Sequence, residues 1–263
     1  MSALEVKGLC KRYPAFSLEN VSFSVPEGAV MGFIGRNGAG KSTTLKSILG
    51  LVHPDAGEVT VLGKSFREEE QYIKERIGVV LGGIDFYPKK KVRLLSDVTR
   101  RFYGNWQEEK YRHYLNLFGI DQEKRVDQLS TGMRVKYMIA LALSHDARLL
   151  ILDEPTSGLD PLMQNEFVEL LLEEKQKGKT IFMSSHIFEE VERTCDRTAI
   201  IKDGKIVTIE DMASLKAKKQ KSFVITFDSE KERQRFSSEP FEIARAEGNT
   251  AIVVLSGDVD GFM

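Results

Sequence analysis

Residues 35–43 (GRNGAGKST) have the residue types and the spacing of a loop that binds the phosphates of a nucleotide. Glycines let such a loop curl so that several backbone N–H groups point inward, and the helix after the loop adds its own unpaired donors. In this pattern Lys41 reaches the β- and γ-phosphates, and the Ser42 hydroxyl binds Mg²⁺. The residues predicted to bind a nucleoside triphosphate are Gly35, Asn37, Gly38, Gly40, Lys41, Ser42 and Thr43.

Two carboxylates come after an apolar segment further along the chain. Residues 149–152 (LLIL) are continuously apolar, as in a strand buried on both faces of a parallel sheet, and Asp153 and Glu154 come directly after them. Ligands of open α/β sheets bind at the C-terminal ends of the strands, so these carboxylates are expected beside the phosphates. Asp153 would hold Mg²⁺ through water, and Glu154 would act as general base on the attacking water. The alternative is a pair of carboxylates that only end the strand and cap the next segment of the chain.

A serine and a glycine begin another predicted helix. Residues 129–133 (LSTGM) precede an amphipathic segment that runs to Leu143. Ser130 is a good N-cap, which is the ordinary structural role, but the same geometry also makes an anion site. Further along come residues 157–160 (SGLD) and 184–186 (SSH), and the Asp160 and Pro161 pair is itself a good helix start.

The elements that must hold these residues are also present. Residues 30–34 (VMGFI) predict a buried strand before the phosphate-binding loop, and residues 44–49 predict a helix after it, closed by Gly50. An ordinary glycine turn is the alternative for residues 35–43, and these flanks argue against it. Residues 180–183 predict a further apolar strand, which places His186 close to a C-terminal strand end.

Taken in order, these segments resemble the motifs of the ATP-binding cassette (ABC) family of transporter ATPases, over roughly residues 3–210. In that family two cassettes face each other head to tail and hold two ATP molecules between them. The resemblance implies that Ser130 and Gly132 of one subunit bind the γ-phosphate held by Lys41 of the other. It also implies that Asp160 lies in a loop that crosses the interface.

Two further residues take roles from the resemblance. His186 matches the family's switch histidine, which implies a hydrogen bond to the γ-phosphate and help in orienting the water. Without the other motifs, a histidine at a strand end would more often have no role in the reaction. Tyr13 matches the aromatic residue that stacks on adenine, and the alternative is a packing residue before Pro14.

The fold that the resemblance implies is α/β, with a P-loop NTPase core built on a mixed sheet and an N-terminal antiparallel β-subdomain. An α-helical subdomain is inserted at about 83–145, and this subdomain docks on a membrane partner. The cassette would span 1–210. Residues 211–263 are predicted to form a small α+β C-terminal accessory region, with a βαββ pattern after a basic linker at 216–221. The pattern lacks a further element to complete a sheet, which indicates either a shortened chain or an incomplete accessory domain.

This chain departs from the family pattern at two places. Gly82 and Gly83 stand where a glutamine that senses the γ-phosphate is usual, and Thr131 and Met133 stand where glycine and glutamine are usual. These changes are similar to those of bacterial ABC exporters related to bacitracin resistance and peptide export. We expect slow hydrolysis by the isolated protein, with Asp85 as one candidate substitute for the glutamine. The glycines are expected to serve backbone conformations that a larger residue cannot adopt.

Composition excludes several classes of function. The 38 lysines and arginines balance 39 aspartates and glutamates, so the chain has no large net positive charge whose electrostatic field would attract nucleic acid or an anionic membrane. No apolar run approaches the ~20 residues of a membrane span, and residues 1–5 lack the features of a secretory signal. Cys10 and Cys195 are too few for a disulfide framework. We expect a cytoplasmic protein, peripheral on the inner face of the cell membrane through a permease partner.

The sequence therefore predicts the ATPase subunit of an ABC exporter that uses ATP and Mg²⁺. Its expected partners are a second copy or a homologous cassette in a head-to-tail dimer and separate transmembrane permease subunits, without nucleic acid. Soluble ABC ATPases that act on ribosomes or DNA are one alternative, although they usually carry two cassettes or a long coiled coil. A regulator that scarcely hydrolyses ATP is the other, suggested by Gly82 and opposed by Glu154 and His186.

Overall fold

The computed structural model describes residues 1–82, 87–218, 220–236 and 242–256. The chain divides into two compact units, Met1–Ile209 and Glu210–Met263. Among the described residues no helix is both long and apolar enough to cross a membrane.

The first unit begins with an antiparallel sheet in the order β2-β1-β4-β5. Its strands are β1 (Ser2–Tyr13), β2 (Phe16–Pro26), β4 (Ala56–Val61) and β5 (Lys64–Ser65). The predicted N-terminal antiparallel β-subdomain is therefore confirmed. Its strands β1 and β2 pair across a two-residue connection, with Tyr13 opposite Phe16.

A six-stranded sheet in the order β10-β9-β3-β8-β7-β6 forms the centre of the first unit. Its strands are β3 (Val30–Ile34), β6 (Ile77–Val80), β7 (Leu149–Asp153), β8 (Thr180–Ser185), β9 (Arg197–Lys202) and β10 (Lys205–Asp211). The strands from β9 to β6 pair in parallel, so their C-terminal ends meet at one edge. The phosphate-binding loop comes after β3, the two carboxylates end β7, and His186 comes after β8 at this edge.

Apolar side chains join the two sheets. Phe23 of β2, Phe33 of β3 and Phe182 of β8 form an aromatic cluster with ring centroids 5.1–5.6 Å apart. Leu45 and Ile48 of α1 (Lys41–Ile48) are buried in the same core. Burial of these large side chains, at roughly 1.5–3 kcal/mol each, fixes α1 and therefore the loop before it.

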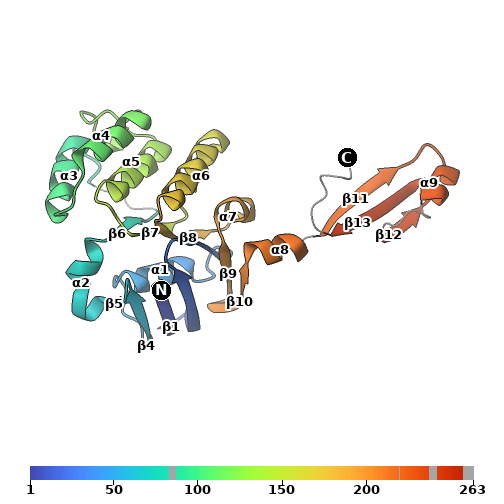
Figure 1. Cartoon of the computed structure of the whole chain (residues 1–263), viewed down its shortest axis with the longest axis horizontal. Helices are drawn as coiled ribbons and strands as arrows, with labels where there is room; N and C mark the ends of the chain where they lie inside the picture. Colours follow the sequence, from blue (N-terminus) through green and yellow to red (C-terminus); the bar gives the residue numbers. More distant parts are fainter. Residues whose placement is uncertain (83–86, 219, 237–241, 257–263) are drawn as a thin grey trace. The chain divides into compact units, whose positions relative to one another are not determined.

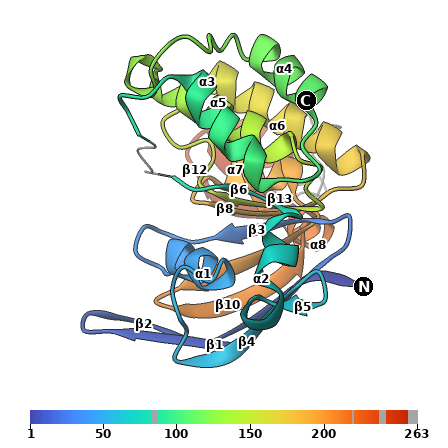
Figure 2. The same cartoon turned by 90° about the vertical axis from the view of Figure 1, so that its left-hand side faces the viewer.

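Most of the other helices of the first unit lie on the side of the central sheet opposite to α1. In Figures 1 and 2, α3, α4 and α5 gather on one side of β6, β7 and β8, while α1 lies on the other side. The helical elements are α2 (Phe66–Lys74), α3 (Val92–Thr99), η1 (Arg100–Phe102), α4 (Glu108–Leu117), η2 (Val126–Gln128), α5 (Thr131–Leu143), α6 (Pro161–Gln176) and α7 (Phe188–Thr194). The sequence did not predict α2 and α7, which are only nine and seven residues long.

The second unit contains α8 (Met212–Lys218), β11 (Gln220–Thr226), α9 (Glu230–Phe236), β12 (Glu242–Glu247) and β13 (Thr250–Ser256). The three strands form an antiparallel sheet in the order β11-β13-β12, which confirms the βαββ pattern. The prediction of a basic linker at 216–221 is wrong over residues 216–218, because these residues belong to α8. Met212 is buried there, and Lys216 is exposed on the surface of the helix.

Candidate functional site

Glycines shape the loop between β3 and α1. Gly38 has φ +81° and Gly40 has φ +112°, both in the region that favours glycine. A Cβ on Gly40 would lie 2.6 Å from Leu18 Cδ2, and one on Gly35 would lie 2.6 Å from the Ile201 carbonyl oxygen. Gly40 is the N-cap of α1, which therefore begins at Lys41, three residues earlier than predicted. A glycine cap has no side chain, so the first-turn N–H groups of α1 are available to an anion.

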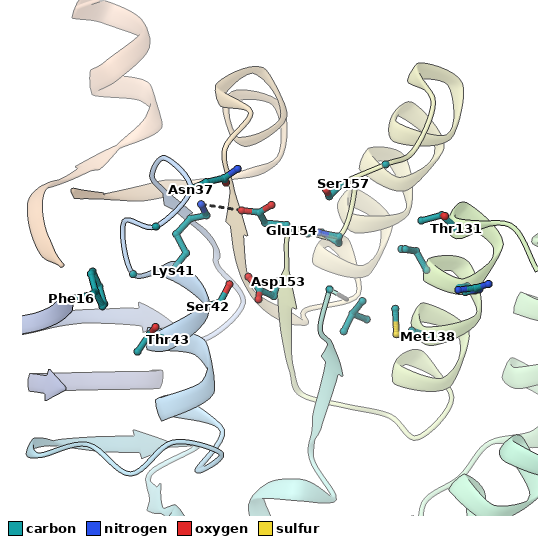
Figure 3. Close-up of a pocket in the computed structure, with 18 of the residues that line it drawn as sticks. Phe16, Asn37, Lys41, Ser42, Thr43, Thr131, Met138, Asp153, Glu154 and Ser157 are labelled. Carbon is teal, nitrogen blue, oxygen red and sulfur yellow. Dashed lines mark ion pairs between the residues drawn. The ribbon is translucent and has the colours of Figure 1, made fainter. Parts of the chain in front are cut away.

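Lys41 is buried and held at the mouth of this loop. Its ammonium donates to the carbonyl oxygens of Gly35 at 2.7 Å and Arg36 at 3.2 Å. The same Nζ lies 2.9 Å from Glu154 Oε1, the ion pair drawn in Figure 3. Lys41 therefore connects the phosphate-binding loop to the end of β7.

Ser184 holds the Asp153 carboxylate and the backbone of Glu154, a role that the sequence did not predict. Its hydroxyl donates to Asp153 Oδ1 at 2.6 Å and lies 3.1 Å from the Glu154 backbone nitrogen, which donates to it. Asp153 is opposite Ser184 in the β7–β8 register, and both are buried. The only signal in the sequence was the position of Ser184 in the segment SSH; its contacts require the two strands to pair.

Glu154 lies between two other polar groups. One carboxylate oxygen contacts Lys41, and the other, Oε2, lies 3.3 Å from His186 Nδ1. The backbone of Glu154 has φ +46°, an uncommon conformation for a residue other than glycine. The structure thus brings together Lys41, Glu154 and His186 from three different strand ends.

A cavity of about 1040 Å³ opens at this edge of the sheet. In Figure 3 Lys41, Ser42 and Thr43 lie on one side of it, and Thr131 and Met138 of α5 lie on the other. The predicted site residues that line it are Asn37, Gly38, Gly40, Lys41, Ser42, Thr43, Asp153 and Glu154. Ser42 and Asp153 share this cavity, and one hydroxyl and one carboxylate suit Mg²⁺, which keeps waters and binds substrate phosphates.

Among the described residues, Phe16 and not Tyr13 is the aromatic residue that lines the cavity. Tyr13 is 43% exposed, with Lys11 Nζ 5.8 Å from its ring centroid. Phe16 begins β2 and approaches Gly40, whose added Cβ would lie 2.9 Å from Phe16 Cζ. The sequence offered two aromatic residues close together here, and the packing against Gly40 distinguishes them. The adenine-stacking role of Tyr13 stays a prediction.

Three other predicted residues lie outside the cavity of their own chain. Ser130 and Asp160 are N-caps: Ser130 Oγ accepts from Met133 N at 3.2 Å, and Asp160 Oδ1 accepts from Met163 N at 2.9 Å. Gly132 is buried, and a Cβ there would lie 2.7 Å from Met163 Cε. Each has a structural role within the chain, and their γ-phosphate contacts across two subunits stay predictions.

Gly82 also lines the cavity, and its backbone does not require a glycine. Its φ is outside the left-handed region, and among the described residues an added Cβ would meet only the Asp153 carbonyl oxygen, at 3.4 Å. The expectation that glycine is needed here for conformational reasons is therefore wrong. Gly83 and Asp85 lie outside the described residues.

A glycine loop before a helix, a lysine on that loop and a carboxylate pair at a neighbouring strand end define a P-loop nucleoside triphosphatase. Comparisons with known proteins identify the family within this class. A family model described as ABC transporter matches residues 18–157. The bacitracin transport ATP-binding protein BcrA of Bacillus licheniformis is 36% identical over 78% of this chain and 68% of its own length. The ABC transporter ATP-binding protein NatA of Bacillus subtilis is 38% identical over 73% of this chain and 80% of its own.

A solved structure described as the ATP binding subunit of an ABC transporter is 31% identical, with a TM-score of 0.74 over 82% of this chain and 92% of that one. The chain belongs to the ABC transporter family. It is an ATP-binding cassette, an ATPase that uses ATP and Mg²⁺.

Proposed function

We propose that this chain is the ATP-hydrolysing subunit of an ABC exporter and works with separate transmembrane permease subunits. The observation that carries the chemistry is Glu154, held between the Lys41 ammonium at 2.9 Å and the His186 ring at 3.3 Å. The exporter assignment is supported by relatives such as BcrA and the Nod factor export ATP-binding protein I of Burkholderia orbicola, 35% identical over 78% of this chain. The exported substrate depends on the permease.

Each residue of the site takes one role in this proposal. Lys41 and the loop N–H groups bind the β- and γ-phosphates, and Ser42 and Asp153 hold Mg²⁺, which neutralises phosphate charge. Glu154 accepts the proton of the attacking water, and His186 orients that water. Because Glu154 shares its carboxylate between Lys41 and His186, phosphate binding at Lys41 changes the partners of the base.

The site is completed by a second cassette in this proposal. Ser130 and Asp160 are both exposed at helix N-termini, and Leu162, close to Asp160, is 69% exposed. An exposed N-cap with free first-turn donors can accept an anion from another molecule. We therefore assign Ser130, Gly132 and Asp160 to contacts across a head-to-tail dimer, with a second copy or a homologous cassette as the partner.

A second cavity supports a permease as the other partner. It has a volume of about 880 Å³ and is lined by residues of α2, β6, η1 and α5. Two large apolar residues along it are exposed: Phe102 at 73% and Leu51 at 61%. A cytoplasmic segment of the permease would cover them, and the chain would lie on the inner face of the cell membrane. The cassette assignment of residues 1–210, with 211–263 as an accessory region, is part of the same proposal.

The test is the variant Glu154→Gln. Glutamine keeps the size and the hydrogen bonds but cannot accept the proton, so ATP hydrolysis should fall by about 10²–10⁴-fold while ATP binding persists. Phosphate release and nucleotide titration measure the two quantities. Glu189→Gln, an exposed glutamate of α7, is the control and should leave both unchanged. Normal hydrolysis by Glu154→Gln would show that the base lies elsewhere.

A further inference from the structure

Glu190 of α7 carries a buried carboxyl group directly behind the site. The residue is 7% exposed, and its Oε2 accepts a hydrogen bond from Ser185 Oγ at 2.7 Å. Its other oxygen, Oε1, is buried without a hydrogen-bond partner among the described residues. Burying a carboxyl group costs free energy unless its contacts repay it, so the contacts of Glu190 indicate its role.

The first contact holds the backbone around His186. Ser185 precedes His186 at the end of β8, and its hydroxyl accepts from the Ile187 backbone nitrogen at 3.0 Å. The hydroxyl has one proton, which it gives to Glu190 at 2.7 Å; the competing acceptor, the Ile187 carbonyl oxygen, lies at 3.4 Å. Glu190 thereby fixes the orientation of the group that closes the turn around His186.

The His186 side chain connects this turn to Glu154, because its Nδ1 lies 3.3 Å from Glu154 Oε2. Burial raises the pKa of Glu190, and the Ser185 and Thr156 hydroxyls act against that rise. The backbone of Glu154 has φ +46°, and its loop is closed by Ser157 N, which donates to the Glu154 carbonyl oxygen at 3.0 Å.

We propose that Glu190 is a positioning residue for ATP hydrolysis. Its carboxyl group holds the Ser185 hydroxyl that closes the turn around His186, and so maintains the distance between the His186 ring and the Glu154 carboxylate. Glu190 acts through Ser185 and does not contact the nucleotide. The inference rests on the proposed roles of Glu154 and His186 in the reaction.

Steady-state ATPase kinetics of the full chain test this role. Glu190→Ala should lower kcat by roughly 10–100-fold, because a misplacement of about 1 Å has an effect of this order, and should leave KM for ATP within about threefold. Glu190→Gln should keep kcat within about threefold of wild type, because its amide oxygen still accepts from Ser185. The control is Glu189→Ala, the exposed glutamate next to it, which should be unchanged.

A double-mutant cycle separates positioning from general damage to the fold. In a His186→Ala background, Glu190→Ala should lower kcat by less than about threefold further, since the group it positions is gone. Thermal melts show whether each variant folds. If Glu190→Ala does not fold, Ser185→Ala breaks the same link from the other side and should give the same loss of kcat.

Wild-type turnover by folded Glu190→Ala would overturn the inference, and so would a loss that multiplies with that of His186→Ala or a loss that is only in ATP affinity. Glu154→Gln, measured in the same assay, keeps the two proposals apart. If Glu154→Gln hydrolyses ATP normally, the proposed function itself fails. If Glu154→Gln is inactive and Glu190→Ala is not, only the role of Glu190 is wrong.

Discussion

Glu154 takes a left-handed backbone conformation with φ +46°, which costs a residue other than glycine about 1–2 kcal/mol. Hydrogen bonds from its backbone nitrogen to the Ser184 carbonyl and hydroxyl oxygens, at 3.2 and 3.1 Å, hold it there. Its carboxylate then reaches both Lys41 and His186. Strain of this kind persists where the surroundings fix it and the reacting group needs the geometry.

Lys41 is the residue on which ATP affinity should depend most. Lys41→Ala removes charge-assisted hydrogen bonds to phosphate, each of which contributes about 1.5–3 kcal/mol, so ATP affinity should fall by at least about tenfold per bond lost. The fold should persist, because Leu45 and Ile48 still bury α1. Nucleotide titration and a thermal melt measure both quantities. Lys46→Ala, an exposed lysine on the same helix, is the matched control; unchanged ATP affinity in Lys41→Ala would contradict the phosphate-binding loop.

Gly82→Gln should raise the slow hydrolysis of the isolated protein by less than about tenfold, since Glu154 and His186 already supply the main catalytic groups. The backbone accepts a side chain here, because among the described residues an added Cβ contacts only the Asp153 carbonyl oxygen, at 3.4 Å. Gly104→Gln, at an exposed glycine with open space around it, controls for the added glutamine. The same ATPase assays compare His186→Ala, whose rate of ATP hydrolysis should be severely reduced. Fast wild-type turnover, or near-normal turnover of His186→Ala, would contradict this account.

At the scale of elements, His145 joins α5 to the edge strand that leads to the site. Its Nε2 lies 2.9 Å from the Ile77 carbonyl oxygen of β6, and its Nδ1 lies 3.1 Å from the Leu141 carbonyl oxygen of α5. The ring also stacks on Tyr103, with centroids 3.8 Å apart. One buried ring thus connects three segments, of which β6 ends just before Gly82.

Stability should depend on pH through this ring. Burial lowers the pKa of His145 from 6.5, nearby Lys179 lowers it further, and its hydrogen bonds to the Ile77 and Leu141 carbonyl oxygens and the charge of Asp146 oppose the shift. The unfolded chain therefore binds a proton first, so the stability present above about pH 6.5 is lost as the pH falls. Denaturant unfolding at pH 7.5, 6.5 and 5.5 measures the free energy of unfolding of wild type and of His145→Gln. The difference between these two free energies should narrow as the pH falls. A constant difference would mean that His145 does not titrate in this window.

At the scale of the whole molecule, the proposed function needs two cassettes. In Glu154→Gln each ATP should bridge two subunits for longer, because it is not hydrolysed, and the protein should run as a dimer in size-exclusion chromatography with ATP and Mg²⁺. The same variant with ADP should run as a monomer. Adding Lys41→Ala should abolish the ATP-dependent dimer. A monomer under all conditions would contradict the head-to-tail site, although a homologous cassette as the natural partner would then be the next one to test.

Much of the fold is predictable from local patterns in the sequence. The strands β3 and β7 and the helices α4 and α5 begin and end within one or two residues of their predicted limits, because continuous apolar runs and helical periodicity are local signals. The helix α8 was missed in favour of a linker, because its lysines dominate the composition while the burial of Met212 is a tertiary effect. The short helices α2 and α7 depend in the same way on the elements they pack against.

The sequence by itself determined the phosphate-binding loop and the carboxylate pair, because each is a contiguous segment that its own residue types and spacing identify. Only the tertiary structure decided which groups support them. Ser184 meets Asp153 across paired strands, 31 positions along the chain, and Phe16 packs against Gly40. Glu190 acquires a role because α7 brings its carboxyl group to Ser185. These contacts depend on strand register and burial, which no short segment of sequence contains.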